Sequence, residues 1–290
     1  MKLFLQMLIL TCLILGGGST TWASSLPRYP EDDWEALSKI LNDKTIPVTW
    51  KDSHGNSIVD FHMKYGSEDT AVNYLKRATL QELSLIKAGD LLNAAAWYGS
   101  QQIVQVLLNR GVSPNPKMPF ISAPLMSASS RGNLEIMRML IRAKADVMAR
   151  SKYGRDALFI ALEMGQFRAL NLLLDNGVNL EWYKKSGNNG AIIFTAINGK
   201  SKDVVNLLLR NGFNPNVFNE LDETPLVHAI RRNAGINIIV LLLNSGADEC
   251  LPTRDGKLPR EVVAELSDIE EPWKREYVHI FKKECQIKPE

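Results

Sequence analysis

The chain has 290 residues, of which 45% are hydrophobic and 23% charged, and this composition is ordinary for a globular protein. Its 34 Lys and Arg residues almost balance its 32 Asp and Glu residues. No basic field therefore favours binding to nucleic acid, and no acidic field favours a basic partner.

The first 23 residues have the parts of a secretory signal peptide. A single charge, Lys2, precedes an apolar run over residues 3–15, and Thr21-Trp-Ala23 places small residues at the −3 and −1 positions of a cleavage site. An uncleaved membrane anchor is the alternative, but the run is short for a bilayer span, which needs about 20 residues. We expect residues 1–23 to be removed and the mature chain to be exported. We expect no membrane insertion after cleavage, because no later apolar run could span a bilayer.

The compartment is predicted from the same signal. It directs a protein either to the bacterial periplasm or into a eukaryotic secretory route. The sequence contains no Asn-x-Ser/Thr acceptor for glycosylation, which favours a bacterial source. We expect a periplasmic protein, with an extracellular one as the alternative.

Residues 24–51 are predicted to cap the N-terminal end of the domain that follows. Apolar side chains at Trp34, Leu37, Ile40 and Leu41 have the spacing of one face of a helix.

From residue 52 to residue 250 one pattern returns at a nearly constant interval. Its marker is a glycine, or once an asparagine, that ends a helical segment: Gly66, Gly99, Gly132, Gly165, Gly199 and Asn233. From Gly99 onward the steps are 33, 33, 34 and 34 residues. We therefore expect repeat units at residues 52–84, 85–117, 118–150, 151–184, 185–218 and 219–250, of which the first is divergent.

Each unit is predicted to contain two helices. The first helix carries a small residue before the marker, such as Ala95 or Ala161, so that neighbouring helices can approach closely. The marker glycine is expected to end this helix with a positive φ. The second helix carries an aliphatic pair toward the core, followed three residues later by a second glycine, which Lys144 replaces in one unit. The expected fold class is an all-α solenoid.

The pattern resembles the ankyrin repeat. Asp222-Glu-Thr-Pro-Leu226, His228-Ala229 and Gly246-Ala-Asp248 are similar to the turn and helix-start residues of that family. The resemblance covers about residues 52–266. It implies paired antiparallel helices joined by short hairpin loops, with helical caps at both ends. Unit 185–218 departs from it, with Gly190-Ala191 in place of the Thr-Pro start.

Residues 251–290 are expected to form the closing repeat and a tail, with helices over 259–266 and 273–285. Signal cleavage would leave two cysteines, Cys250 and Cys285, and in an exported protein such a pair is a disulfide candidate. Against a bridge, the two occupy similar positions in successive units, whereas bridged Cα atoms lie within about 7 Å. The sequence leaves both states open.

Motifs for catalysis, metal binding or nucleotide binding are absent from the sequence. No two of the four histidines lie at i, i+3 or i+4, no Cys-x-x-Cys occurs, and no Gly-x-Ser-x-Gly, Walker-type or Rossmann pattern is present. We expect no enzyme, no metal site and no cofactor. An enzyme or metal carrier built on the repeat scaffold is the alternative.

The resemblance also implies a binding groove, lined by the residues just before each marker and by the adjoining hairpin tips. The residues predicted to bind a partner there are Tyr65, Trp97, Tyr98, Arg131, Tyr153, Met164, Trp182, Arg231 and Arg232. Ile197 is expected on the same strip and Tyr183 on a tip. Trp, Tyr and Arg carry much of the binding energy at protein interfaces. The competing interpretation is that Trp97 and Trp182 pack on neighbouring loops.

These features predict a monomeric, non-enzymatic protein–protein interaction module in the bacterial envelope. One form of this hypothesis is an immunity-type inhibitor that neutralises a protein partner. The alternatives within the same class are an envelope scaffold and a secreted effector that acts on host proteins.

Overall fold

The computed structural model describes residues 59, 68–85, 87–115, 122–185, 189–265, 279–281 and 285, all of which belong to a compact unit over residues 47–290. Within these ranges every regular element is a helix, as the all-α prediction requires. The predicted signal peptide, the cap segment 24–51 and Tyr65 lie outside the described residues. Among the described helices, each is too short or too polar to cross a membrane.

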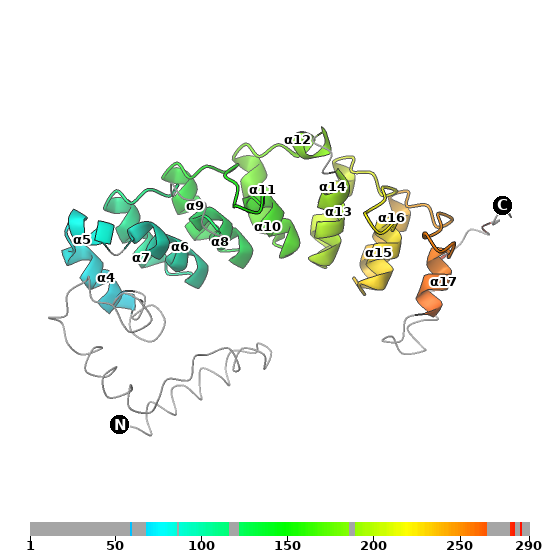
Figure 1. Cartoon of the computed structure of the whole chain (residues 1–290), viewed down its shortest axis with the longest axis horizontal. Coiled ribbons are helices and arrows are strands. Elements are labelled where there is room, and N and C mark those ends of the chain that lie inside the picture. Colours follow the sequence, from blue (N-terminus) through cyan, green and yellow to red (C-terminus); the bar gives the residue numbers. More distant parts are fainter. Residues whose placement is uncertain are drawn as a thin grey trace, which may run out of the picture. The chain divides into compact units, whose positions relative to one another are not determined.

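The first helices of successive units form one row, which we call the inner row (Figure 1). Its members are α6 (Ala88–Tyr98), α8 (Pro124–Arg131), α10 (Ala157–Glu163), α13 (Asn189–Asn198), α15 (Pro225–Arg231) and α17 (Pro259–Ala264). Each helix contacts the next along the row. The predicted second helix of the closing repeat, 273–285, lies outside the described residues except for 279–281 and 285.

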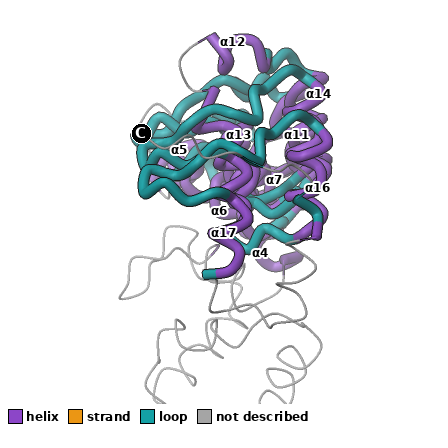
Figure 2. Tube along the Cα trace, turned by 90° about the vertical axis from the view of Figure 1, so that its right-hand side faces the viewer, coloured by secondary structure: helices purple, strands orange, loops and turns teal. Residues whose placement is uncertain are grey.

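The second helices form the outer row, and each contacts the inner helix of its own unit. They are α7 (Gln101–Asn109), α9 (Leu134–Arg142), α11 (Phe167–Asp175), α14 (Lys202–Arg210) and α16 (Ile236–Asn244). At the front of this row, α4 (Glu68–Arg77) packs on α7, and the short α5 (Leu80–Leu85) packs on α6. In the view of Figure 2, the connecting loops lie on the side opposite α11, α14 and α16.

The core explains why these residues form a stack. The small residues of the inner helices are completely buried: Ala95, Ala128, Ala161, Ala196 and Ala229. The first member of each aliphatic pair in the outer row is completely buried as well: Leu107, Leu140, Leu173, Leu208 and Leu242. Small side chains on one row and leucines on the other give each unit an apolar face that only its neighbours can cover.

The helix ends show where sequence and structure agree and where they differ. Gly99, Gly132 and Gly165 have a positive φ, as predicted, and Lys144 adopts the same left-handed conformation in place of glycine. At Gly199 the prediction is wrong, because the positive φ falls on the next residue, Lys200. Gly199 is instead the point of closest approach to the preceding unit, where a Cβ atom would lie 2.3 Å from the carbonyl oxygen of Leu162.

Side chains also join neighbouring units at equivalent positions. The amide nitrogen of Asn115 donates to the carbonyl of Lys144, and its oxygen accepts from the backbone N–H of Asp146, both at 2.8 Å. Asn216 repeats this arrangement with Gly246 and Asp248, at 2.9 and 2.7 Å. Each asparagine therefore ties the start of one hairpin loop to the start of the next.

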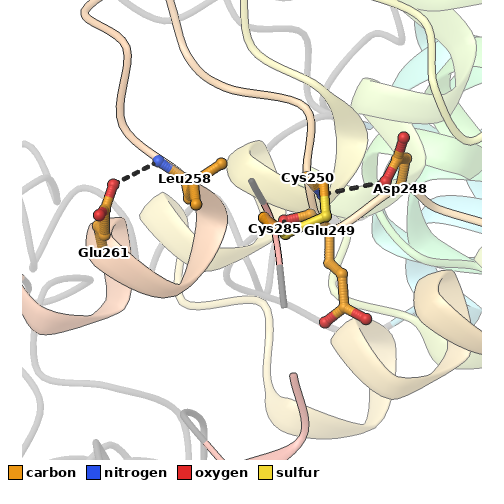
Figure 3. Close-up of a disulfide and its surroundings, with 6 residues drawn as sticks. All are labelled: Asp248, Glu249, Cys250, Leu258, Glu261 and Cys285. Atoms are coloured by element: carbon orange, nitrogen blue, oxygen red, sulfur yellow. Dashed lines mark hydrogen bonds between the residues drawn. A yellow bond between two sulfur atoms is a disulfide. The ribbon is translucent and has the colours of Figure 1, made fainter. Parts of the chain in front are cut away.

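At the C-terminal end, a disulfide joins Cys250 to Cys285, with a Cα–Cα distance of 5.3 Å (Figure 3). The similar positions of the two cysteines in successive units do not keep them apart. The backbone N–H of Cys250 donates to the carboxylate of Asp248 at 3.0 Å, which holds the loop that presents the first sulfur. The bridge attaches residue 285 to the last complete repeat.

Candidate protein-interaction surface

The predicted groove residues of the inner row lie at the same end of successive helices. Trp97 and Tyr98 form the last turn of α6, and their side chains are 40% and 48% exposed. Arg131 ends α8, Met164 follows α10, and Arg231 and Arg232 end α15; all four are exposed. We call this set the inner strip. Ile197 does not belong to it, because its side chain is completely buried, contrary to the sequence prediction.

The front of the inner strip combines a tryptophan with an arginine from the next unit. The guanidinium of Arg131 lies 4.7 Å from the centroid of the Trp97 ring. Its Nε also donates to the backbone carbonyl of Trp97 at 3.3 Å. A cation over an indole face is worth about 0.5–1 kcal/mol at an exposed site. The pair is thus held in place, while its outer surface remains open to solvent.

Farther along the stack, ion pairs run from one end to the other of three inner helices, α10, α15 and α17, whereas α13 has Asn189 and Ile197 at these positions. Arg155 precedes α10 and pairs at 2.9 Å with Glu163, the last residue of that helix. Glu223 precedes α15 and pairs at 2.7 Å with Arg231, the last residue of that helix. Lys257 and Glu265 flank α17 and pair at 2.5 Å. Each pair has the spacing i, i+8 and the same position relative to its unit. This spacing is visible in the sequence and is the signal that the sequence analysis missed.

Uncharged residues occupy these positions in the front units. Two residues before the marker, the front units have Trp97 and Ser130, whereas units 151–184 and 219–250 have Glu163 and Arg231 at the same position. The position of the other partner is occupied by Gly89, in the first turn of α6, and by Ser122, which precedes α8. The inner surfaces of α6 and α8 are therefore not bridged by this type of ion pair.

Arg231 belongs to a buried network, which gives it a structural role besides the binding role predicted for it. The Glu223 side chain is 5% exposed and lies 2.9 Å from Nδ1 of His228. Asn219 donates to the same carboxylate at 3.1 Å. Burial alone would raise the pKa of Glu223, but the hydrogen bonds from His228, Asn219 and Arg231 outweigh it and hold the pKa below its usual value. Glu223 therefore stays charged at neutral pH.

The other predicted contact residues, Tyr153 and Trp182, lie near the two ends of unit 151–184, at the hairpin side of the stack. Trp182 lies on an additional short helix, α12 (Leu180–Lys185), and not on a hairpin tip as predicted. Trp182 is 40% exposed, and the guanidinium of Arg150 lies 4.4 Å from its ring centroid. Tyr153, on the tip of the preceding hairpin, is 65% exposed, with Nζ of Lys152 4.8 Å from its ring centroid.

Tyr183 was also predicted on a tip, but its side chain is buried. Its hydroxyl donates to Oδ2 of Asp156 at 2.6 Å, while Oδ1 of Asp156 accepts from the backbone N–H of Phe159 at 2.9 Å. Burial, followed by the hydrogen bond to Asp156, raises the pKa of Tyr183 well above its usual range. This bond attaches α12 to the start of α10 and thereby positions Trp182 on the surface.

Buried acidic side chains near these surfaces are held by contacts within the protein. Within the described ranges, no three His, Cys, Asp or Glu side chains come together in a way that could hold a metal ion. The buried carboxylates of Asp156 and Glu223 are each engaged by hydrogen bonds inside the protein. What the two surfaces offer to solvent is aromatic rings and cations.

Comparisons with known proteins identify the repeat. Residues 91–183 match the family model for ankyrin repeats (3 copies). The ankyrin repeat and KH domain-containing protein mask-1 of Caenorhabditis elegans is 30% identical over 180 residues, which are 61% of this chain but only 7% of that protein. The chain thus corresponds to a small part of the length of this relative.

Two solved structures have the same architecture. The human ASB11 ankyrin repeat domain matches with a TM-score of 0.58 and 20% identity, over 77% of this chain and 97% of that one. An ankyrin repeat domain from Acinetobacter baumannii AYE matches with a TM-score of 0.50 and 26% identity, over 66% and 95% of the two chains. These similarities support the paired-helix stack that the sequence pattern predicts.

Proposed function

Because this chain is a solenoid of ankyrin repeats, which are protein–protein interaction modules, we propose that it holds a protein partner on the front of its inner strip. The observation that carries the proposal is the exposed cluster of Trp97, Tyr98 and Arg131 at the ends of α6 and α8. Large aromatic side chains on a rigid helix expose apolar area that a partner can cover. Repeat stacks use such extended surfaces for binding.

The choice of the front of the strip follows from the ion pairs. On α10 and α15, Glu163 and Arg231 already have partners within their own units, and a ligand would have to compete with those pairs. At the front of the strip, the Trp97 ring lies beside the Arg131 guanidinium. Among the described residues, Arg131 forms no ion pair with a carboxylate, so a ligand would not have to displace one. Residues of this kind are over-represented among those that dominate binding energy.

Replacing Trp97 with alanine is expected to weaken partner binding by about 2 kcal/mol or more, close to thirtyfold in Kd, because a central aromatic contact is lost. The partner would be captured on the immobilised mature protein and its affinity then measured by calorimetry. Gln105→Ala, on the outer helix α7, is the matched control and should leave Kd unchanged. Equal affinity of the Trp97→Ala variant and the control would contradict the proposal, provided that both variants keep the melting temperature of the original protein.

We further propose that the partner acts in the bacterial envelope and that the complex neutralises it, in the manner of an immunity protein. The signal-like segment 1–23 and the Cys250–Cys285 disulfide, a bond typical of oxidising compartments, support an exported protein. Inhibition is favoured over scaffolding if the captured partner is an enzyme whose activity falls on complex formation. Unchanged activity favours an envelope scaffold, and capture of a host protein favours a secreted effector.

Export itself gives a direct test. The mature protein isolated from its native source should begin at Ser24, because cleavage is expected after Ala23. N-terminal sequencing and fractionation of the periplasm provide the measurement. Recovery of a chain that begins at Met1, or one that stays with the membrane after carbonate extraction, would rule the export proposal out.

A further inference from the structure

A second exposed surface lies at the hairpin end of the stack, apart from the inner strip. It consists of Arg150, Lys152, Tyr153 and Trp182, and we call it the hairpin patch. Arg150 lies over the ring of Trp182 at 4.4 Å, and Lys152 lies over the ring of Tyr153 at 4.8 Å. Two cations and one aromatic ring from the loop before α10 are thus presented with the Trp182 ring of α12.

In the part of the chain that the structure describes, the two cations of the hairpin patch differ from the acids on the same and adjoining elements, which have partners. Neither Arg150 nor Lys152 forms an ion pair with any residue in the described ranges. Among the acidic neighbours, Asp156 accepts hydrogen bonds from Tyr183 and Phe159. Two further acids are paired internally, Glu163 with Arg155 and Glu181 with Lys184. The patch therefore carries an excess of positive charge on a nearly neutral chain.

The contacts with the aromatic rings hold these cations in conformations that can bind a carboxylate. A guanidinium that rests on an aromatic ring keeps its N–H edge free to donate two parallel hydrogen bonds to a carboxylate. Because the ring also restricts the side chain, less conformational entropy is lost when a ligand binds. Arg150 over Trp182 fits this description, and the Tyr183–Asp156 bond fixes the helix that carries the ring.

A small hollow adjoins the hairpin patch and indicates the size of what fits. Its volume is about 240 Å³, and its lining includes Arg150, Tyr153, Arg155 and Tyr183, together with Asp156, whose carboxylate accepts the hydrogen bonds from Tyr183 and Phe159. Sites for drug-sized ligands usually measure about 300–1,000 Å³. The hollow is therefore suited to one protruding side chain better than to a free small molecule.

We propose that the hairpin patch binds an acidic segment of the partner protein, with a carboxylate on Arg150 and Lys152 and the chain lying across Tyr153 and Trp182. This proposal rests on the proposed function, since it adds a second contact region to the same partner. The reasons for an acidic segment are two cations that form no ion pair within the described residues, acids on the same and adjoining elements that already have partners, and a hollow of side-chain size.

The test uses the full mature chain and a fluorescein-labelled peptide of eight glutamates as the probe, followed by fluorescence anisotropy. The double variant Arg150→Gln/Lys152→Gln should raise the Kd of this peptide about tenfold or more, because each lost hydrogen bond involves charged groups. The matched control is Arg142→Gln/Arg168→Gln, which removes two exposed cations from α9 and α11 in the outer row. It lowers the net charge equally and should leave Kd within about twofold, since distant exposed charges are screened by salt.

Three outcomes would overturn the proposal: no binding of the glutamate peptide, equal weakening by the two double variants, or equally tight binding of an oligonucleotide of eight thymidines. The captured partner separates this proposal from the proposed function. If Trp97→Ala weakens partner binding and Arg150→Gln/Lys152→Gln does not, the inner strip stands and the hairpin patch fails. If no partner is captured at all, the proposed function fails, and the glutamate titration still decides whether the patch binds acidic segments.

Discussion

Replacing Gly199 with alanine should lower the free energy of unfolding by about 3 kcal/mol, at the upper end of overpacking effects. The added Cβ atom would lie 2.3 Å from the carbonyl oxygen of Leu162, 2.9 Å from the backbone nitrogen of Gly165 and 3.1 Å from the carbonyl oxygen of Glu163. All three are backbone atoms, so no side chain can turn away to make room. The inner helices α10 and α13 would have to move apart, and the buried contacts between their units would be lost.

The matched control for this prediction is Gly89→Ala. Gly89 lies in the first turn of α6, and a Cβ atom there would meet nothing within 4 Å. Because alanine is the better helix former, this change should leave stability unchanged or raise it by up to about 1 kcal/mol. Urea denaturation followed by circular dichroism measures both variants. If Gly199→Ala unfolds at the same urea concentration as the original protein, the close approach of the two units at this point is wrong.

Loss of the Cys250–Cys285 disulfide should cost about 3–4 kcal/mol of stability, because the bridge closes a long loop and restricts the unfolded chain. The two cysteines are 35 residues apart in sequence. The loss of stability should fall mainly on the C-terminal end, since the bridge is the cross-link that holds residue 285 against the last complete repeat. Ends of repeat stacks are where such attachments matter most, because a terminal unit has a neighbour on one side only.

The measurement compares Cys250→Ser, Cys285→Ser and the double variant with the original protein, in the presence and absence of a thiol reductant. All three variants should lose about the same stability, and reductant should destabilise only the original protein. Thiol titration of the unfolded, unreduced protein is an independent check. Two free thiols would mean that the bridge does not form in the native protein.

The groove residues divide into those that a pattern could predict and those that it could not. The position of Trp97 near the end of an inner helix follows from its place two residues before Gly99, and the structure leaves it exposed. Ile197 has the same position in its unit but is completely buried. The period assigns both residues to the same part of the helix, but it does not say how the neighbouring units cover each one.

The sequence by itself determined the fold class and most of the described helix ends. It could do so because the period, the small residues and the glycines are local signals that recur in every unit, and each unit contacts only its neighbours. The role of Gly199 depended on the structure, since a close approach between two backbones 34–37 residues apart leaves no local signal.

Only the tertiary structure decided which side chains bind each other. The hydrogen bond from Tyr183 to Asp156, the burial of Glu223 beside His228 and the disulfide of Cys285 all join residues that lie in different turns or units. Such contacts depend on the direction in which each helix presents its side chains after stacking, and small shifts of one helix change them. The tertiary structure therefore decided that Tyr183 is buried while Trp182, its neighbour in sequence, remains available to a partner.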